Sequence, residues 1–307
     1  MTVPSPSSLD MGPLTSAEAQ LMAAPSPTPA ALPRARQKRL RQLSRHWRRH
    51  GVTLLLAASS ICLLFAFWYL GTKYQLEAYI RFKNVPTPAA VLQQALEVTS
   101  SSKFLVNVLS SVRRILLGFA IATLLGVGLG LMIGKYQRVR EFCMPVIEVL
   151  RPIPAIAWVP MSIMLWPSNE ASIVFITFVG AVFPILLNTV HGVHTLDRVL
   201  LNAGRSLGAN ELQLFWFIIL PGVLPSVFTG LAVGMGVAWV SLIAAEMISG
   251  QFGVGYLTWE AYSLVNYPAI VLGMLTIGVL GLVCSGAIHM VGQLVMPWRA
   301  FVNGERK

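Results

Sequence analysis

Residues 202–221 read NAGRSLGANELQLFWFIILP and form a polar stretch between two long apolar ones. Residues 196–207 alternate apolar and polar side chains at helical spacing, and Gly208 can supply the left-handed cap that ends such a helix. Asn210 and Glu211 can start a second short helix. The pattern therefore predicts two short helices that meet at a glycine. Pro221, with Pro225 one turn later, is expected to let the chain turn as it becomes apolar again.

The composition is that of an integral membrane protein. The chain has 307 residues, of which 55% are hydrophobic and 11% charged, and its mean hydropathy is +0.67. Segments of about 20 apolar residues indicate membrane-spanning helices. Six such spans are predicted, and the expected fold is an all-α membrane protein: 51–70, 112–134, 142–166, 171–191, 217–248 and 269–295.

Lys and Arg residues orient these spans. Eight of the 23 basic residues lie in residues 34–49, and others follow the second span or lie in 196–216. The positive-inside rule places this side, with both termini, in the cytoplasm. Residues 1–50 are expected to be a disordered, basic cytoplasmic tail, 51–300 the transmembrane domain and 301–307 a short cytoplasmic tail. The net charge of +11 then reflects topology and contact with anionic membrane lipid, and no nucleic-acid partner is expected.

Two other features distinguish the spans. Five prolines interrupt the third, which is tolerated at membrane depth only where neighbours or a cavity satisfy the freed backbone groups: Pro145, Pro152, Pro154, Pro160 and Pro167. Residues 71–103 are too polar to cross the membrane, and an amphipathic helix is predicted over 89–97.

The polar stretch resembles the cytoplasmic coupling motif of ABC importer permeases, which reads Glu-Ala-Ala, three residues, Gly, nine residues, Ile-x-Leu-Pro. Matching residues fall in register across the whole motif: Ala203, Gly208, Ile218, Leu220 and Pro221. Asn202 stands where the family has its acid, and Gly204 where it has an alanine. Residues 110–119, 148–160, 244–248 and 253–256 narrow the resemblance to the nitrate, sulfonate, taurine and bicarbonate group, and it covers residues 50–300.

This resemblance implies a type I ABC importer permease in a bacterial inner membrane, moving a small anion into the cytoplasm by alternating access. It also implies a second copy of the chain, two cytoplasmic ATP-binding subunits and a periplasmic or lipid-anchored substrate-binding protein. ATP and Mg would be bound by the ATPase subunits. The chain has no Walker glycine loop and no nucleophile-elbow pattern, so we expect a transport subunit that is not an enzyme and binds no cofactor.

Ionisable residues in or beside apolar spans are candidates for the transport pathway, because exposure of such groups to lipid is costly. The candidates are Arg113, Arg151, Glu148 and Glu246, together with Trp158, Gly234 and Ala238. Alternatives remain open: Glu148 and Arg151 can pair along one helical face, the arginines can reach the interface, and Trp158 can pack or belong to an aromatic belt. Gly234 and Ala238 are expected on the axis of the homodimer.

Two further interpretations compete with the importer. His191 and His194 are spaced for a shared metal, but interfacial capping is favoured, and no metal site is expected. An ion-gradient-driven secondary transporter or channel would carry broken helices in both halves, whereas only the third span is broken by prolines.

Overall fold

A computed structural model describes residue 52 and residues 55–74, 84–99 and 101–298. The two predicted tails, 1–50 and 301–307, lie outside the described residues. The described part is helical and contains no strand. The chain divides into two units, 1–68 and 69–307. Helix Leu55–Lys73, which is apolar and long enough to span a membrane, begins in the first unit and ends in the second.

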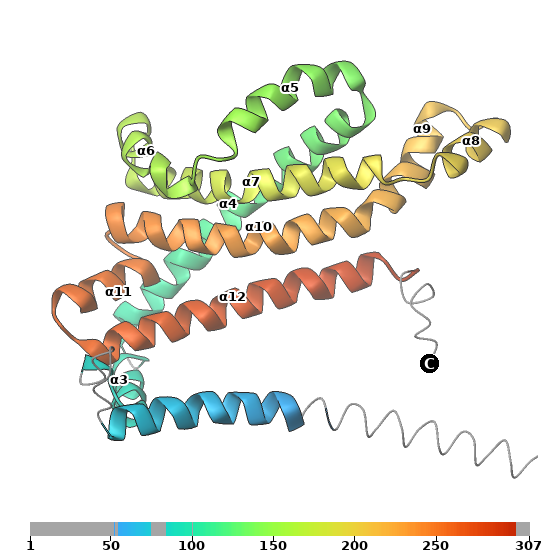
Figure 1. Cartoon of the computed structure of the whole chain (residues 1–307). Coiled ribbons are helices and arrows are strands. Elements are labelled where there is room, and N and C mark those ends of the chain that lie inside the picture. The colour runs from blue at the N-terminus through green and yellow to red at the C-terminus, as the bar shows by residue number, and fades with distance from the viewer. Residues whose placement is uncertain (1–51, 53–54, 75–83, 100, 299–307) are drawn as a thin grey trace, which may run out of the picture. The chain divides into compact units, whose positions relative to one another are not determined.

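The second unit carries the remaining helices, and the amphipathic helix predicted over 89–97 is present in it as α3. In order along the chain they are α3 (Pro88–Thr99), α4 (Ser102–Lys135), α5 (Gln137–Leu150), η2 (Ala155–Trp158), α6 (Val159–Leu165), α7 (Asn169–His194), α8 (Arg198–Ser206), α9 (Glu211–Leu214), the π-helical turn η3 (Phe215–Ile219), α10 (Leu220–Ser249), α11 (Val254–Ser263) and α12 (Tyr267–Val295) (Figure 1).

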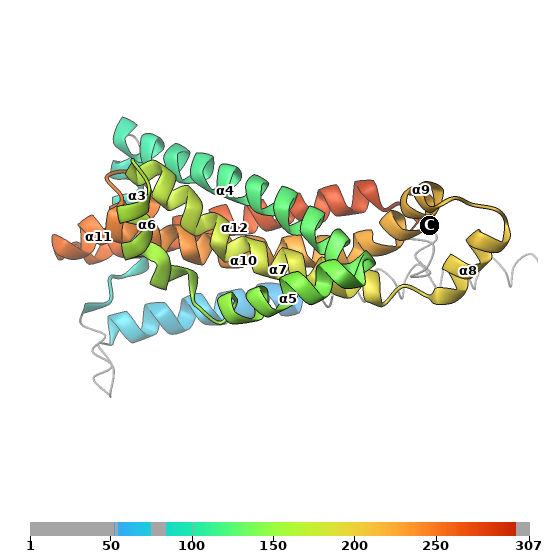
Figure 2. The same ribbon diagram turned by 90° about the horizontal axis from the view of Figure 1, so that it is seen from above.

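Helix α7 is the centre of the second unit. It packs against α4 and α10, and it runs beside α10 in both views (Figures 1 and 2). The core holds fully buried side chains such as Ile173, Ile185 and Leu242. Within its most apolar window 61% of the α7 residues are buried, against 6% for α12. Helix α12 therefore presents most of its apolar surface outward, to lipid or to another chain.

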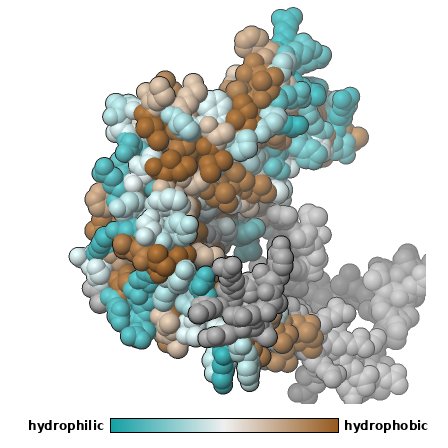
Figure 3. All heavy atoms as spheres, turned by 60° about the vertical axis from the view of Figure 1, so that its left-hand side comes forward, coloured by the Kyte–Doolittle hydropathy of each residue, from teal (hydrophilic) through white to brown (hydrophobic). Residues whose placement is uncertain are grey.

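The outer surface carries many large hydrophobic side chains, as a membrane protein requires. Figure 3 shows hydrophobic patches lying beside hydrophilic regions on one face. Leu124 on α4, Val240 on α10 and Leu282 on α12 are each at least 73% exposed. Water would not solvate such a surface well, so it is suited to contact with lipid tails.

A glycine stripe brings α4 against α7. A Cβ atom on any of four glycines would lie within 3 Å of an α7 side chain, in the pairs Gly118 with Thr177, Gly126 with Ile185, Gly130 with Thr189, and Gly134 with Val193. The offset between partners is the same in all four pairs, so the two helices run parallel and in fixed register. Small residues allow this close approach in lipid, where packing drives association.

The third predicted span, 142–166, is a bent helix pair. α5 and the segment Ala155–Leu165 meet at 86°, and Pro152 and Pro154 lie in the break, as proline interruption predicts. Because α4 and α7 are parallel, the chain must return from the end of α4 to the start of α7. The pair α5 and α6 makes that return. Counted as one span, it brings the candidate spans among the described residues from five to the six predicted.

The turn predicted at Pro221 and Pro225 is wrong. Residues Glu211–Ser249 form one continuous helix. The π-helical turn Phe215–Ile219 precedes Pro221, which lies in the first turn of α10. Local π-helical widening re-satisfies the backbone groups that a proline frees, so the helix continues through Pro221 without a break.

The glycine stripe gives a matched pair of variants. Gly130→Ala places a methyl group 2.7 Å from the Thr189 Cβ, whereas a Cβ at Gly128 meets nothing within 4 Å. We expect Gly130→Ala to destabilise the protein by about 1–3 kcal/mol through overpacking. Gly128→Ala should be neutral or stabilise by up to about 1 kcal/mol, because alanine favours the helix. Thermal unfolding of the purified proteins in detergent measures both, and equal behaviour of the two variants would contradict the packing of α4 on α7.

Candidate functional site

The predicted coupling segment forms a compact knob, residues 197–214. The Asp197 side chain accepts a hydrogen bond from the Val199 amide at 2.8 Å and caps the start of α8. Gly208 ends α8 with φ of +84°. The Ala209 and Gly208 amides donate to the Gly204 and Arg205 carbonyl oxygens at 3.1 and 3.0 Å, which is the paired hydrogen bonding of a Schellman cap. The prediction that Gly208 supplies a left-handed cap is confirmed.

The second half of the knob, α9, also begins with a side-chain cap. The Asn210 side chain accepts from the Gln213 amide at 2.8 Å, and the Gln213 side chain accepts from the Asn210 amide at 2.9 Å. This capping box starts α9, as predicted from Asn210. Gly204 is buried against α9 and η3, because a Cβ there would lie 2.7 Å from the side chains of Leu214 and Ile218. The coupling motif has alanine at this position, and the smaller glycine lets α8 lie closer to the chain that follows.

The knob leaves an outward surface that nothing else in the described residues covers. Asn202, Ala203 and Gly208 are exposed, and Leu207 and Leu212 are 88% and 67% exposed. The remaining motif residues, Ile218, Leu220 and Pro221, are half-buried and join the knob to α10. Apolar side chains displayed on a locally rigid surface indicate a protein contact.

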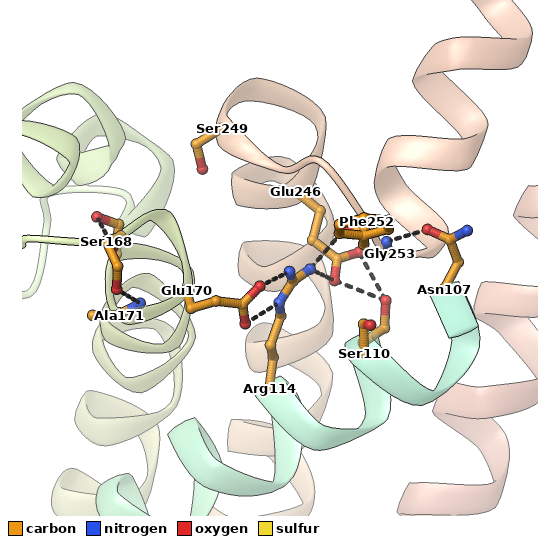
Figure 4. A network of polar contacts seen from close by, with 12 residues as sticks. Asn107, Ser110, Arg114, Ser168, Glu170, Ala171, Glu246, Ser249, Phe252 and Gly253 are labelled. Atoms are coloured by element: carbon orange, nitrogen blue, oxygen red, sulfur yellow. Dashed lines mark hydrogen bonds and ion pairs between the residues drawn. The ribbon is translucent and has the colours of Figure 1, made fainter. Parts of the chain in front are cut away.

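A network of charged groups lies at the opposite end of α10, centred on Arg114 of α4 (Figure 4). The Arg114 side chain is 2% exposed. Its Nε donates to the Glu170 carboxylate at 2.9 Å, and its Nη2 pairs with the other oxygen of the same carboxylate. Its Nη1 donates to Glu246 at 2.9 Å and to the Phe252 carbonyl oxygen at 2.6 Å. One guanidinium therefore joins α4, α7, α10 and the loop after α10.

Glu246 is fully buried and its carboxylate is occupied within the chain. Besides Arg114, it accepts from the Ser111 hydroxyl at 2.7 Å and from the Gly255 amide at 3.0 Å. The Gly253 amide donates to the Asn107 side chain at 2.6 Å. Several donors around one carboxylate compensate the cost of taking its charge out of water.

The glycines after Glu246 are required by this geometry. Gly253 has φ of +125°, and a Cβ there would collide with the Glu246 carboxylate. A Cβ on Gly255 would lie 2.9 Å from the Glu246 Cβ. The acid followed by two spaced glycines, which supported the family resemblance, is thus one structural unit.

The other predicted pathway residues lie apart. Arg113, Glu148 and Arg151 are exposed. No ion pair joins Glu148 to Arg151 within the part of the chain that the structure describes. The pairing alternative is therefore absent here, and the pathway role of the two arginines stays a prediction.

Gly234 and Ala238 lie on the face of α10 that packs on α7. A Cβ on Gly234 would come 2.9 Å from Ile185, and Ala238 is fully buried. A position on the axis between two copies would require this contact to open. Trp158 is half-buried, and its indole nitrogen is buried with no hydrogen-bond partner among the residues that the structure describes.

The sequence reasoning missed Glu170 and the central part played by Arg114. A signal was present for Arg114, because it lies one helical turn before Gly118 and shares the α7-facing stripe with it. Glu170, in the first turn of α7, carried no comparable signal.

Comparison with known proteins identifies the family. Residues 122–298, more than half of the chain, match the model of the binding-protein-dependent transport system inner membrane component. The chain belongs to this family. The match includes the knob, α10 and Glu246.

Several ABC transporter permeases match this chain over most of their own length. A putative ABC transporter permease protein of Methanocaldococcus jannaschii is 38% identical over 64% of this chain and 74% of its own. The nitrate import permease protein NrtB of Synechocystis is 31% identical over 70% and 81%. The taurine transport system permease protein TauC of Escherichia coli is 28% identical over 81% and 91%. The chain is an ABC transporter permease with apolar membrane-spanning helices.

Arg114 and Arg113 are adjacent but differ in burial, which permits a direct test of the network. Arg114→Ala leaves the buried Glu246 carboxylate without its cation, and loss of one partner of a buried pair costs about 3–5 kcal/mol. Arg113→Ala removes the same charge from an exposed site and should change stability by less than about 1 kcal/mol. Thermal unfolding in detergent, with the amount of membrane-inserted protein, distinguishes them. Similar losses in both variants would show that Arg114 does not hold the network together.

Proposed function

We propose that this chain is the membrane subunit of an ATP-driven importer that carries a small anion into the cytoplasm. The observation that carries the proposal is the knob, which is capped at Asp197, Gly208 and Asn210 and displays exposed apolar side chains. A surface made rigid by the chain's own caps, yet left uncovered, fits a groove on a partner. The match to ABC transporter permeases supports ATP-binding subunits as that partner, and ATP and Mg would be bound there.

The proposed mechanism uses α10 as a rigid connection. The helix Glu211–Ser249 is continuous from the knob to the residues around Glu246. Closure of two ATPase subunits would move the knobs, and α10 would carry that movement across the membrane. Access would then alternate between a binding protein outside and the cytoplasm. An ion-gradient-driven transporter or channel needs no ATPase partner, so that alternative does not explain the exposed surface of the knob.

Two observations support a small anion as the substrate: the names of the relatives and the exposed arginines. The relatives named above are a nitrate and a taurine permease, and both substrates carry an anionic group. Arg113 and Arg151 are exposed cations in the second and third predicted spans, and we propose that they attract the anion in transit. Selectivity among nitrate, sulfonate, taurine and bicarbonate would belong mainly to the binding protein.

Two knobs are needed for two ATPase subunits, so we propose a homodimer with two-fold symmetry, both termini in the cytoplasm of a bacterial cell. The exposed face of α10 is a suitable contact between copies. Val233, Gly236, Val237 and Val240 recur on it at helical spacing and are exposed.

Gly208 offers the decisive variant. Gly208→Trp is expected to insert in the membrane normally, because a Cβ there meets nothing within 4 Å. It should lower substrate-stimulated ATPase activity and transport together, at least ten-fold, since a bulky residue at positive φ strains the cap and obstructs the partner. Gly208→Asn, which tolerates the left-handed conformation, is the control and should keep most activity. Normal transport by the tryptophan variant would overturn docking of the ATPase through the knob.

The dimer contact can be tested with single cysteines in a protein whose three native cysteines, Cys62, Cys143 and Cys284, are replaced. Val240→Cys should cross-link two copies, because Val240 is 73% exposed. Ala238→Cys is the control, since Ala238 is buried against α7 and should give no cross-link. Gel electrophoresis of oxidised membranes measures the product. A cross-link from Ala238→Cys alone would mean that α7 and α10 separate in the assembled transporter.

A further inference from the structure

A basic cavity of about 510 Å³ lies at the knob end of the second unit. It is enclosed by the last turns of α4 and α7, the start of α5, and the knob. Glu211 is the one carboxylate in its lining. Four cationic side chains line it as well: Lys135, Arg140, Arg198 and Arg205. The coupling motif does not account for it, because Lys135 and Arg140 belong to other helices.

The charges in this cavity are unbalanced. The Glu211 carboxylate is shared, with one oxygen 3.5 Å from the Lys135 Nζ and the other 3.2 Å from the Arg205 Nη2. Arg140 and Arg198 have no ion pair within the described residues. Like charges gathered in one cavity repel one another unless an anion lies between them.

The adjoining cavity does not remove this excess. It has a volume of about 540 Å³ and shares Lys135, Arg140 and Arg198, but Glu141 and Glu148 also line it. Three cations face two carboxylates there, whereas four cations face one carboxylate in the knob-side cavity. Most of the surplus of positive charge therefore lies on the knob side.

One wall of the cavity is fixed in place. The Lys135 side chain is only 19% exposed, and its Nζ lies 5.4 Å from the centre of the Tyr136 ring and 5.6 Å from that of Phe215. Cation–π contacts of this kind hold an ammonium group without neutralising it. The cavity thus presents a positioned cation, with Arg140 and Arg198 free to bind a ligand.

The cavity lies at a membrane boundary. Lys135 and His194 are the last residues of the apolar helices α4 and α7. Exposed aromatic side chains gather at the same end: Tyr136, Phe142, Trp216 and Phe217 are between 51% and 82% exposed. Aromatic rings at helix ends mark the level of lipid headgroups.

We propose that this cavity binds a phosphate group, and that its source is the headgroup of an anionic lipid in the leaflet facing the ATPase. Arginine and lysine donors match phosphate oxygens, and basic pockets between helix ends are known sites for anionic headgroups. The exposed aromatic side chains would lie at the level of the same headgroup. The headgroup would then join α4, α5 and α7 to the knob. The assignment of the site to this leaflet depends on the cytoplasmic orientation given in the proposed function. The binding of a phosphate group does not depend on it.

The test measures binding alone and needs neither ATP nor transport. The full chain, purified in detergent, is titrated with dioleoylphosphatidylglycerol or dioleoylphosphatidylcholine, and stabilisation against heat gives an apparent affinity. Phosphatidylglycerol should stabilise the wild type at lower concentration than phosphatidylcholine. Arg140→Gln should weaken phosphatidylglycerol binding about five-fold and Arg140→Gln with Arg198→Gln about 30-fold, at about 1 kcal/mol per charge.

Arg138→Gln is the matched control, because Arg138 is an exposed residue of the same helix and does not line the cavity. It should keep wild-type affinity within two-fold. Equal losses in the Arg138 and Arg140 variants, or no preference for phosphatidylglycerol, would overturn the site. Stabilisation by millimolar sodium phosphate alone, lost in the Arg140 variant, would support the phosphate chemistry and overturn the lipid as its source.

Discussion

The contact between the Arg114 guanidinium and two carboxylates is the interaction on which the arrangement of the spans depends. An arginine at membrane depth is unfavourable by roughly 3 kcal/mol or more when it faces lipid. The chain can contain Arg114 only if α4, α7 and α10 meet so that Glu170 and Glu246 reach it. Each carboxylate in turn restricts the backbone nearby, most clearly at Gly253. A charge that is costly alone thereby selects one arrangement of three helices.

The glycine stripe on α4 extends this selection along the membrane. Arg114 fixes one end of the α4–α7 contact, and Gly118 to Gly134 let the two helices stay close to the other end. Because the packing partners keep a constant offset, neither helix can slide without moving α7 side chains from the glycines onto α4 residues that are too large for them. Lys135 then meets Glu211 of the knob. The glycine packing, the Arg114 network at one end and the Lys135–Glu211 pair at the other thus fix the positions of the two ends of the second unit relative to each other.

The sequence predicted those features that local chemistry decides. Apolar runs located the spans, Gly208 and Asn210 located the caps of the knob, and prolines located the break in the third span. The pairing of Arg114 with Glu170 and Glu246 could not be predicted, because it depends on which faces of distant helices meet. The bend expected at Pro221 was wrong for a related reason: a proline also fits inside a helix whose preceding turn widens, and the π-helical turn at Phe215–Ile219 leaves no sign in the composition. Gly234 and Ala238 have the small side chains expected at any close contact, and they do not tell a contact within the chain from one between copies.

The continuous helix from the knob to the charge network limits how the protein can move. At 1.5 Å per residue its 39 residues extend about 58 Å, so a tilt of about 5° at one end displaces the other by about 5 Å. The same helix is held to α7 along much of its length and to α4 through Arg114. It cannot tilt alone without breaking these contacts. The three helices should therefore move as one body. In the proposed transport cycle, the surfaces that slide or separate would then lie outside it, on the sparsely buried α12, on the bent α5–α6 pair and, in the proposed homodimer, between the two copies.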